Sequence, residues 1–126
     1  MLQQTRITMM LPVKDLQRAR EFYEDRLGFV AGELRADGKF AYDCDGLTIA
    51  LFPKDGGTRA DHTALSFEVP DIAAAIADLQ QRGVTFEDYD FPGLRTEAHV
   101  CVLGAEKAAW FLDTEGNCLC LHENLR

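Results

Sequence analysis

The sequence predicts an α+β fold built from two tandem βαβββ modules with mixed sheets. Two observations lead to this prediction. A strand, a turn, a helix and a glycine stop occur in this order from Ile7 to Phe29 and again from Thr63 to Val84. Three short strand candidates then follow each helix. A chain of 126 residues has the usual size of one domain, so we expect a single domain over residues 1–126, with module one at 1–54, a linker at 55–61 and module two at 62–126.

Both predicted helices begin and end at residues suited to those places. Asp15 and Asp71 precede the helical segments, where an aspartate accepts hydrogen bonds from the first free backbone N–H groups. Gly28 and Gly83 follow them, and glycine readily adopts the left-handed conformation found after a helix. Apolar residues recur at helical spacing between these points. Both helices should therefore be amphipathic, with one face packed against a sheet.

The strands are predicted from short apolar or alternating segments between turn residues. Asp37-Gly38, Asp45-Gly46 and Glu115-Gly116-Asn117 are typical of hairpin turns. Besides the first strand of each module, the predicted strands are residues 30–34, 39–43 and 47–52 in the first half, and 85–88, 99–103 (with 108–112 as its continuation or partner) and 118–122 in the second.

The first and last strands of each module have two faces that differ in side-chain type. Alternate residues of a strand point to opposite sides of a sheet, so odd and even positions separate the faces. The odd positions are mostly Ile, Leu, Val and Phe, which would pack against the helices. The even positions are smaller and more polar, yet have almost none of the Lys, Glu and Arg typical of an exposed face. We interpret the even face as the wall of a partly sheltered cavity for a small molecule.

The charge of the chain limits its partners. A formal net charge of −8 repels phosphate backbones and anionic membranes, which argues against nucleic-acid and membrane partners and favours cationic or neutral ligands. The most apolar N-terminal segment, residues 7–13, is too short to span a bilayer, so we expect a cytoplasmic protein. The four cysteines are then expected to be reduced and buried.

Four segments carry motifs that together cover nearly the whole chain: Val13-Lys14-Asp15-Leu16, Phe22-Tyr23-Glu24-Asp25-Arg26-Leu27-Gly28-Phe29, Val69-Pro70-Asp71-Ile72 and Phe111-Leu112-Asp113-Thr114-Glu115-Gly116-Asn117. They resemble segments of the vicinal oxygen chelate superfamily, which contains glyoxalases, bleomycin-resistance proteins and extradiol dioxygenases. The helix end in the second segment and the turn in the fourth are the more specific motifs. The resemblance implies paired βαβββ modules whose sheets curl around a ligand cavity.

Metal-dependent members of that superfamily place His, Glu or Gln on the first and last strand of each module. The resemblance puts those positions at Thr8, Ala50, Ala64 and Cys120. Alanine cannot coordinate a metal, and His62 and His122 should lie roughly 13 Å apart along their strands, too far to share an ion. The thiols of Cys118 and Cys120 share one strand face with His122, where side chains diverge instead of surrounding an ion. We therefore expect no metal and no other cofactor.

Three functional hypotheses remain open. The first is a metal-free small-molecule-binding protein, resembling the bleomycin-resistance branch, that sequesters a cationic or neutral ligand. The second is an enzyme acting on a small metabolite, with no assigned catalytic residue: a lyase or isomerase that uses side chains such as Glu68 and His62, or a dioxygenase-like metal enzyme whose ligands lie at other positions than those assigned above. The third is a ligand sensor or structural partner. The predicted ligand-binding residues are Thr8, Met10, Tyr42, Thr48, Ala50, Phe52, His62, Ala64, Ser66, Trp110, Cys118 and Cys120.

A homodimer is the expected assembly. The family resemblance implies it, and two curled four-stranded sheets from one short chain leave strand edges and apolar surface uncovered. A symmetric partner can cover both.

Overall fold

The computed structural model describes residues 1–59 and 61–125 and confirms the α+β class. The chain divides into two compact units, one comprising Met1–Arg59 and Thr114–Gly116, the other Ala60–Asp113 and Asn117–Arg126. Each unit contains a strand, a helix and further strands that form an open, four-stranded mixed sheet. This is the tandem βαβββ arrangement predicted from the sequence, except that Thr114–Gly116 belong to the first unit although they lie late in the chain.

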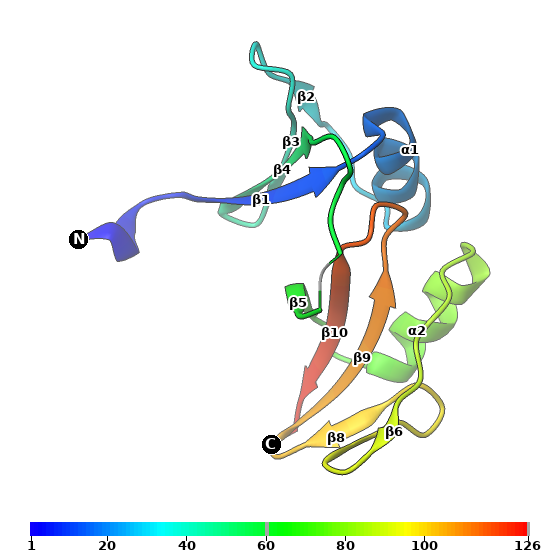
Figure 1. Cartoon of the computed structure of the whole chain (residues 1–126). Coiled ribbons are helices and arrows are strands. Elements are labelled where there is room, and N and C mark those ends of the chain that lie inside the picture. The colour runs from blue at the N-terminus through cyan, green and yellow to red at the C-terminus, as the bar shows by residue number, and fades with distance from the viewer. Residues whose placement is uncertain (60, 126) are drawn as a thin grey trace. The chain divides into compact units, whose positions relative to one another are not determined.

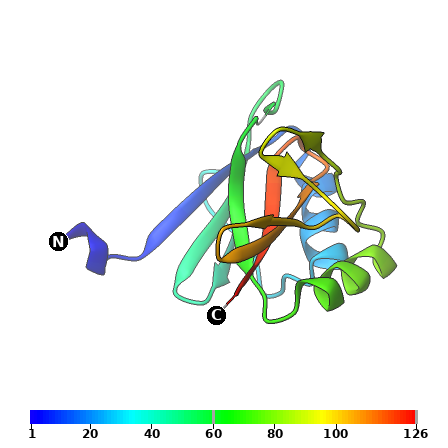
Figure 2. The same ribbon diagram turned by 90° about the horizontal axis from the view of Figure 1, so that it is seen from below.

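The first unit contains η1 (Leu2–Gln4), β1 (Ile7–Val13), α1 (Leu16–Glu21), the π-helical turn η2 (Phe22–Arg26), β2 (Glu33–Leu34), β3 (Phe40–Cys44) and β4 (Leu47–Pro53). Its strands lie in the order β1-β4-β3-β2, with β1 and β4 parallel and the other neighbours antiparallel. The turn η1 lies at the outer end of β1, at the N-terminus of the chain, in both views (Figures 1 and 2).

The second unit contains β5 (Thr63–Glu68), α2 (Ile72–Gln81), β6 (Asp90–Phe91), β7 (Leu94–Arg95), β8 (Cys101–Leu103), β9 (Glu106–Leu112) and β10 (Cys118–Asn124). Its main sheet has the order β5-β10-β9-β8, with β5 and β10 parallel, and α2 packs beside β9 and β10 (Figure 1). The strand order of the first sheet is thus repeated. A separate hairpin of β6 and β7 has no counterpart in the predicted strands.

Two of the predicted strands need correction. Residues 85–88 do not form a strand in a ladder; Phe86 alone makes an isolated bridge, to Phe111. The segment 30–34 is extended into a strand only from Glu33, because Ala31 has a positive φ of 56° and Gly32 lies so close to the rings of Phe40 and Tyr42 that a Cβ would collide with them. The predicted segment 108–112 belongs to β9, which pairs antiparallel with β8 through residues 106–108, so it is part of a partner strand and not a continuation.

The predicted helix ends are confirmed. The side chain of Asp15 accepts a hydrogen bond from the backbone N–H of Arg18 at 3.1 Å, and Asp71 accepts one from Ala74 at the same distance. Gly28 and Gly83 have φ values of 80° and 91°, in the left-handed region that favours glycine. Among the described residues no helix is long and apolar enough to cross a membrane.

The apolar face of each sheet forms the core of its unit. In the first unit it packs against the helical segment, where Ala19, Phe22 and Tyr23 are buried. In the second unit it packs against Ile72 and Ile76 of α2. The odd positions of the sheets supply its most buried side chains, Leu11, Val13, Ile49, Leu51, Leu119 and Leu121. The apolar odd positions of these strands therefore form the packed face, whereas the other face has smaller side chains, of which Thr48, Ala50, Cys118 and Cys120 are also buried.

Candidate functional site

The open face of the first sheet contains a hollow of about 340 Å³. Strand pairing assembles its floor, because Thr8 lies opposite Thr48 and Ala41 lies opposite Ala50. Small side chains on adjacent strands leave space above the backbone, and the volume is within the range of small-molecule sites. The lining residues are Arg6, Thr8, Arg35, Lys39, Ala41, Asp43, Thr48 and Ala50.

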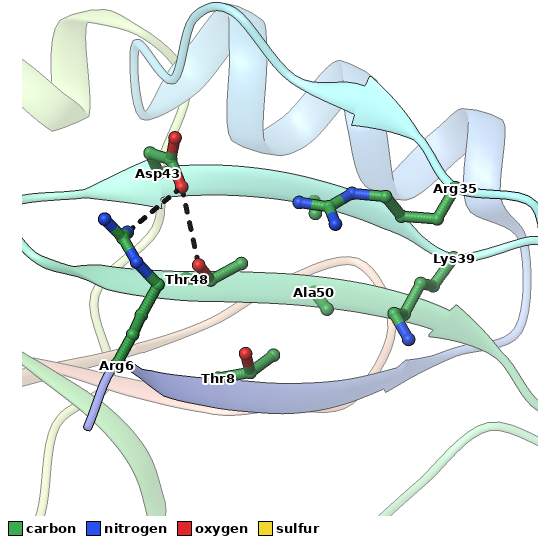
Figure 3. A pocket seen from close by; sticks show the side chains of 8 residues that line it. Arg6, Thr8, Arg35, Lys39, Asp43, Thr48 and Ala50 are labelled. Carbon is green, nitrogen blue, oxygen red and sulfur yellow. Dashed lines mark hydrogen bonds and ion pairs between the residues drawn. The ribbon is translucent and has the colours of Figure 1, made fainter.

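Charged side chains stand at both ends of this hollow (Figure 3). At one end the guanidinium of Arg6 lies 3.4 Å from the carboxylate of Asp43, which also accepts a hydrogen bond of 3.4 Å from the hydroxyl of Thr48. At the other end Arg35 and Lys39 extend from the hairpin of β2 and β3. The charged lining therefore consists of three cations and one carboxylate.

The hollow brings together three of the residues predicted to bind a ligand, Thr8, Thr48 and Ala50. Met10 lies opposite Ala50 on the same face but does not line the hollow, and its side chain is about half exposed. Phe52 also lies on an even position of β4 and is partly buried. The four charged residues at the ends and Ala41 were not predicted from the sequence.

Tyr42 lies on the opposite face of this sheet, away from the hollow. It stands opposite Ile49, is 1% exposed, and donates a hydrogen bond of 2.7 Å from its hydroxyl to Glu24. The reason is the two-residue turn at Asp45 and Gly46, which pairs Cys44 with Leu47, so odd residues of β3 share a face with even residues of β4. That turn is recognisable in the sequence and would have placed Ala41 and Asp43, instead of Tyr42, on the open face.

The open face of the second sheet carries a different set of predicted residues. Ser66 lies opposite Cys120, and Cys120 lies opposite Trp110 on its other side. The indole N–H of Trp110 donates a hydrogen bond of 3.1 Å to the hydroxyl of Thr63, and its ring packs edge-on against Tyr89 at 5.5 Å between centroids. This face thus offers thiols, hydroxyls and aromatic rings.

A serine, a histidine and a glutamate lie together on this second face. The hydroxyl of Ser66 is 2.6 Å from Nδ1 of His122, and Nε2 of His122 is 3.8 Å from the carboxylate of Glu68. Glu68 and His122 are paired across β5 and β10. Such a group can hold a proton and pass it to a bound molecule. Glu68 was considered from the sequence as a base, whereas the contact of His122 with Ser66 was not predicted.

An irregularity in the ladder between β5 and β10 places His62 and Ala64 differently from simple alternation. The register steps from Thr63 opposite Cys118 to Leu65 opposite Leu119, so Ala64 lies at the step. Thr63, not Ala64, is therefore the partner of Cys118. His62 precedes the strand, its side chain is 77% exposed, and its nearest charged partner is Asp61 at 3.5 Å. The alternation of apolar and polar residues could not predict this step. One extra residue in β5 moves the side chains that precede it to the opposite face of the sheet.

The thiols of the second face are held in their neutral form. Burial is the main cause that raises the pKa of Cys118 and of Cys120, and the negative charge of Glu87 adds to the effect at Cys118. A neutral thiol is a poor nucleophile and a poor metal ligand. Within residues 1–59 and 61–125, no group of three or more His, Cys, Asp and Glu side chains is arranged to hold a metal ion.

The fold and these two open faces define a protein of paired βαβββ modules. The sequence matches the Glyoxalase/Bleomycin resistance protein/Dioxygenase superfamily over residues 5–121, and the chain belongs to this family. No curated protein matches the sequence significantly.

Several solved structures have the same fold. A glyoxalase family protein from Enterococcus faecalis is 25% identical with a TM-score of 0.71, covering 98% of this chain and 100% of that one. An antibiotic-binding protein from a Streptomyces species is 23% identical with a TM-score of 0.65, covering 96% of both chains. A fosfomycin resistance protein from Listeria monocytogenes is 20% identical with a TM-score of 0.67, covering 95% of this chain and 91% of that one.

Proposed function

We propose that this chain is a metal-free protein that binds and sequesters a small molecule on the open face of its first sheet. The observation that carries the proposal is the hollow of about 340 Å³ whose floor is made of Thr8, Ala41, Thr48 and Ala50. Side chains this small leave volume for a guest, and the threonine hydroxyls can orient it. The antibiotic-binding and fosfomycin-resistance proteins with the same fold support a role in small-molecule binding.

The residues present do not fit the divalent metal used by other members of the superfamily. The positions that the family resemblance assigns to ligands are held by Thr8, Ala50, Ala64 and Cys120. Two of these are alanines, which have no donor atom, so at most the hydroxyl of Thr8 and the thiol of Cys120 remain as donors at the four positions. The proposed function therefore depends on shape and polar contacts, without a metal.

Substitution of Thr8 by tryptophan tests the site. Thr8 is exposed on the floor of the hollow, so Thr8→Trp should fill the space while leaving the packed face of the sheet intact. We expect a melting temperature within a few degrees of wild type and at least a tenfold loss of affinity for single-ring probes such as benzoate, benzamide and benzylamine, measured by ¹H–¹⁵N NMR titration.

The matched control is Thr85→Trp, which makes the same change at an exposed threonine of the second unit. It should leave probe binding unchanged. If Thr8→Trp bound the probes as tightly as Thr85→Trp does, the hollow would not be the binding site.

The cluster of Ser66, His122 and Glu68 favours a second candidate, an enzyme of the lyase or isomerase type. The hydroxyl of Ser66 holds the ring of His122 through Nδ1, and Nε2, which lies 3.8 Å from the carboxylate of Glu68, is left to exchange a proton with a substrate. The test is deuterium incorporation at the α-carbon of a panel of ketones and 2-oxo acids in D₂O, followed by NMR. Exchange above the buffer rate that His122→Asn abolishes would support the enzyme; no exchange above that rate would exclude it for this class of substrate.

The location and assembly of the chain stay predictions: a cytoplasmic protein without nucleic-acid or membrane partners, acting as a homodimer. The edge strand β1 leaves Ile7 and Met10 55% and 48% exposed, which favours a partner that covers apolar surface. Sedimentation velocity at micromolar concentration should show a dimer, and a monomer alone would contradict this prediction.

A further inference from the structure

The charges that line the hollow of the first unit are opposite in sign to the charge of the chain. The chain carries a formal net charge of −8, whereas the hollow is lined by Arg6, Arg35 and Lys39 against the single carboxylate of Asp43. Arg6 is paired with Asp43 at 3.4 Å. The surplus positive charge of the hollow therefore lies on Arg35 and Lys39.

The hairpin between β2 and β3 holds these two cations on one face. The backbone N–H of Arg35 donates to the carbonyl of Lys39 at 2.8 Å, and the ladder continues with Leu34 opposite Phe40 and Glu33 opposite Ala41. Opposed residues of an antiparallel pair point to the same side of a sheet. Figure 3 shows both side chains extending over the floor that contains Ala50. Two cations from one hairpin thus share one end of the hollow.

Each of these two cations has an acidic partner that lies outside the hollow. The carboxylate of Glu33 lies 3.9 Å from Arg35 and its side chain is 77% exposed. That of Asp37 lies 2.7 Å from Lys39 and its side chain is 60% exposed. Ion pairs at such exposure contribute little, because water and salt screen them. Neither acid lines the hollow, so an anionic group of a ligand inside it can take their place.

We propose that Arg35 and Lys39 recognise a carboxylate or phosphate head group of the ligand, whose compact body lies over Ala41 and Ala50. A guanidinium donates two parallel hydrogen bonds to either anion, and the ammonium of a lysine adds a third donor with a full charge. This assignment rests on the proposed binding function, and it replaces the cationic or neutral ligand that the net charge alone favoured. The sign of the local field, not of the whole chain, selects the ligand.

Four probes of similar size separate charge from shape: benzoate, phenyl phosphate, neutral benzamide and cationic benzylamine. Each is titrated into the full chain at constant ionic strength, and ¹H–¹⁵N NMR shifts are followed at the amides of Thr8, Lys39 and Ala50. We expect benzoate or phenyl phosphate to bind at least tenfold more tightly than benzamide, and benzylamine to bind more weakly still. The comparison of the two anions identifies which head group is preferred.

The variant Arg35→Gln/Lys39→Gln should weaken binding of the preferred anion at least tenfold and leave benzamide binding unchanged. Arg95→Gln is the matched control, because Arg95 also lies in a short hairpin with an acidic partner at 3.9 Å, but in the second unit. If the double variant bound the anion as tightly as wild type, or if benzylamine bound as tightly as benzoate, Arg35 and Lys39 would not select an anionic ligand. The proposed binding function would then still hold. If none of the four probes shifted the amides of Thr8 and Ala50, both proposals would be wrong.

Discussion

The two units of the chain share a topology but differ in the chemistry of their open faces. Both sheets follow the order first, last, third and second strand, and both cover their packed face with a helix that begins at an aspartate. The open face of the first unit has alanines and threonines between charged ends, whereas that of the second has Ser66, His122, Trp110 and two thiols. The buried face is constrained by packing in both units. The open face is free of that constraint, so its chemistry can diverge.

The units also differ in the acid that supports the start of each helix. The side chain of Glu115 is fully buried and accepts hydrogen bonds from the backbone N–H groups of Lys14 and Asp15 at 2.8 and 2.9 Å and from Arg18 at 2.7 Å. The counterpart in the second unit is Glu123, which is partly exposed and accepts from the backbone N–H of Ile72 at 2.8 Å. The carboxylate of Glu115 is thus buried and accepts hydrogen bonds from several donors, whereas that of Glu123 is partly exposed and caps the start of α2.

The largest expected effect is the loss of the buried carboxylate. Glu115→Gln keeps the volume but directs an amide N–H₂ group at donors, so it should lower the free energy of unfolding by about 3 kcal/mol. Glu123→Gln should cost about 1 kcal/mol or less, since water can satisfy the exposed groups there. Urea denaturation of the two variants measures the difference. If both variants lost the same unfolding free energy, the two carboxylates would contribute equally, and the proposed difference between the units would be wrong.

The same carboxylate should make stability depend on acid pH. Burial alone would raise the pKa of Glu115, but hydrogen bonds from Arg18, from the backbone of Lys14 and Asp15 and from Thr114 outweigh it and lower the pKa from 4.5 to about 2. A folded-state pKa below the unfolded one stabilises the protein above pH 4.5, and this contribution is lost as pH falls toward 2. By linkage it amounts to about 3 kcal/mol.

Unfolding free energies of wild type and Glu115→Gln, measured from pH 6 to pH 3, should therefore converge as the pH falls. The variant lacks this titrating group, so its stability should decline less steeply over that interval. Parallel curves for the two proteins would count against the assigned pKa of Glu115 and against its role as a charged junction.

A smaller effect is expected from Tyr42→Phe, which compares the two faces of the first sheet. Burial is the main cause that raises the pKa of Tyr42, so its hydroxyl is neutral and donates to Glu24, which also pairs with Arg20 at 2.9 Å. Removing one hydroxyl should cost about 1 kcal/mol of unfolding free energy. Benzoate binding should stay unchanged, because Tyr42 lies on the packed face. If Tyr42→Phe kept its stability but no longer bound benzoate, the ligand would lie on the packed face, and our assignment of binding to the open face would be wrong.

The smallest expected effect is that of chelation. Protein purified without chelators should contain no stoichiometric divalent metal, and EDTA should leave the melting temperature unchanged, because neither open face offers a fitting set of donors among the described residues. Elemental analysis and a thermal melt measure both outcomes. One tightly bound Zn, Ni, Mn or Fe per chain would contradict the metal-free assignment, and its loss in Cys120→Ser would locate the metal on the second unit.

The sequence by itself determined the features that depend on near neighbours. The aspartate caps, the glycine stops after both helices and the Asp45-Gly46 turn depend on residues within a few positions of one another, and all are in the structure as predicted. Alternation of apolar residues also identified the packed face, since burial of one face imposes a period of two on a strand. The α+β class and the repeated module follow from these local signals.

Tertiary structure alone decided which side chains from distant segments meet. The irregularity beside Ala64 changes the faces of β5, and no local signal marks it. The contact between Ser66 and His122 depends on that register, and the junction at Glu115 depends on contacts across about a hundred residues of chain. Arg35 and Lys39 flank the predicted Asp37-Gly38 turn, and only the hairpin brings both side chains to the hollow. Local propensity acts through backbone sterics and near hydrogen bonds, whereas a site is assembled by the register and packing of whole elements, which a single segment does not encode.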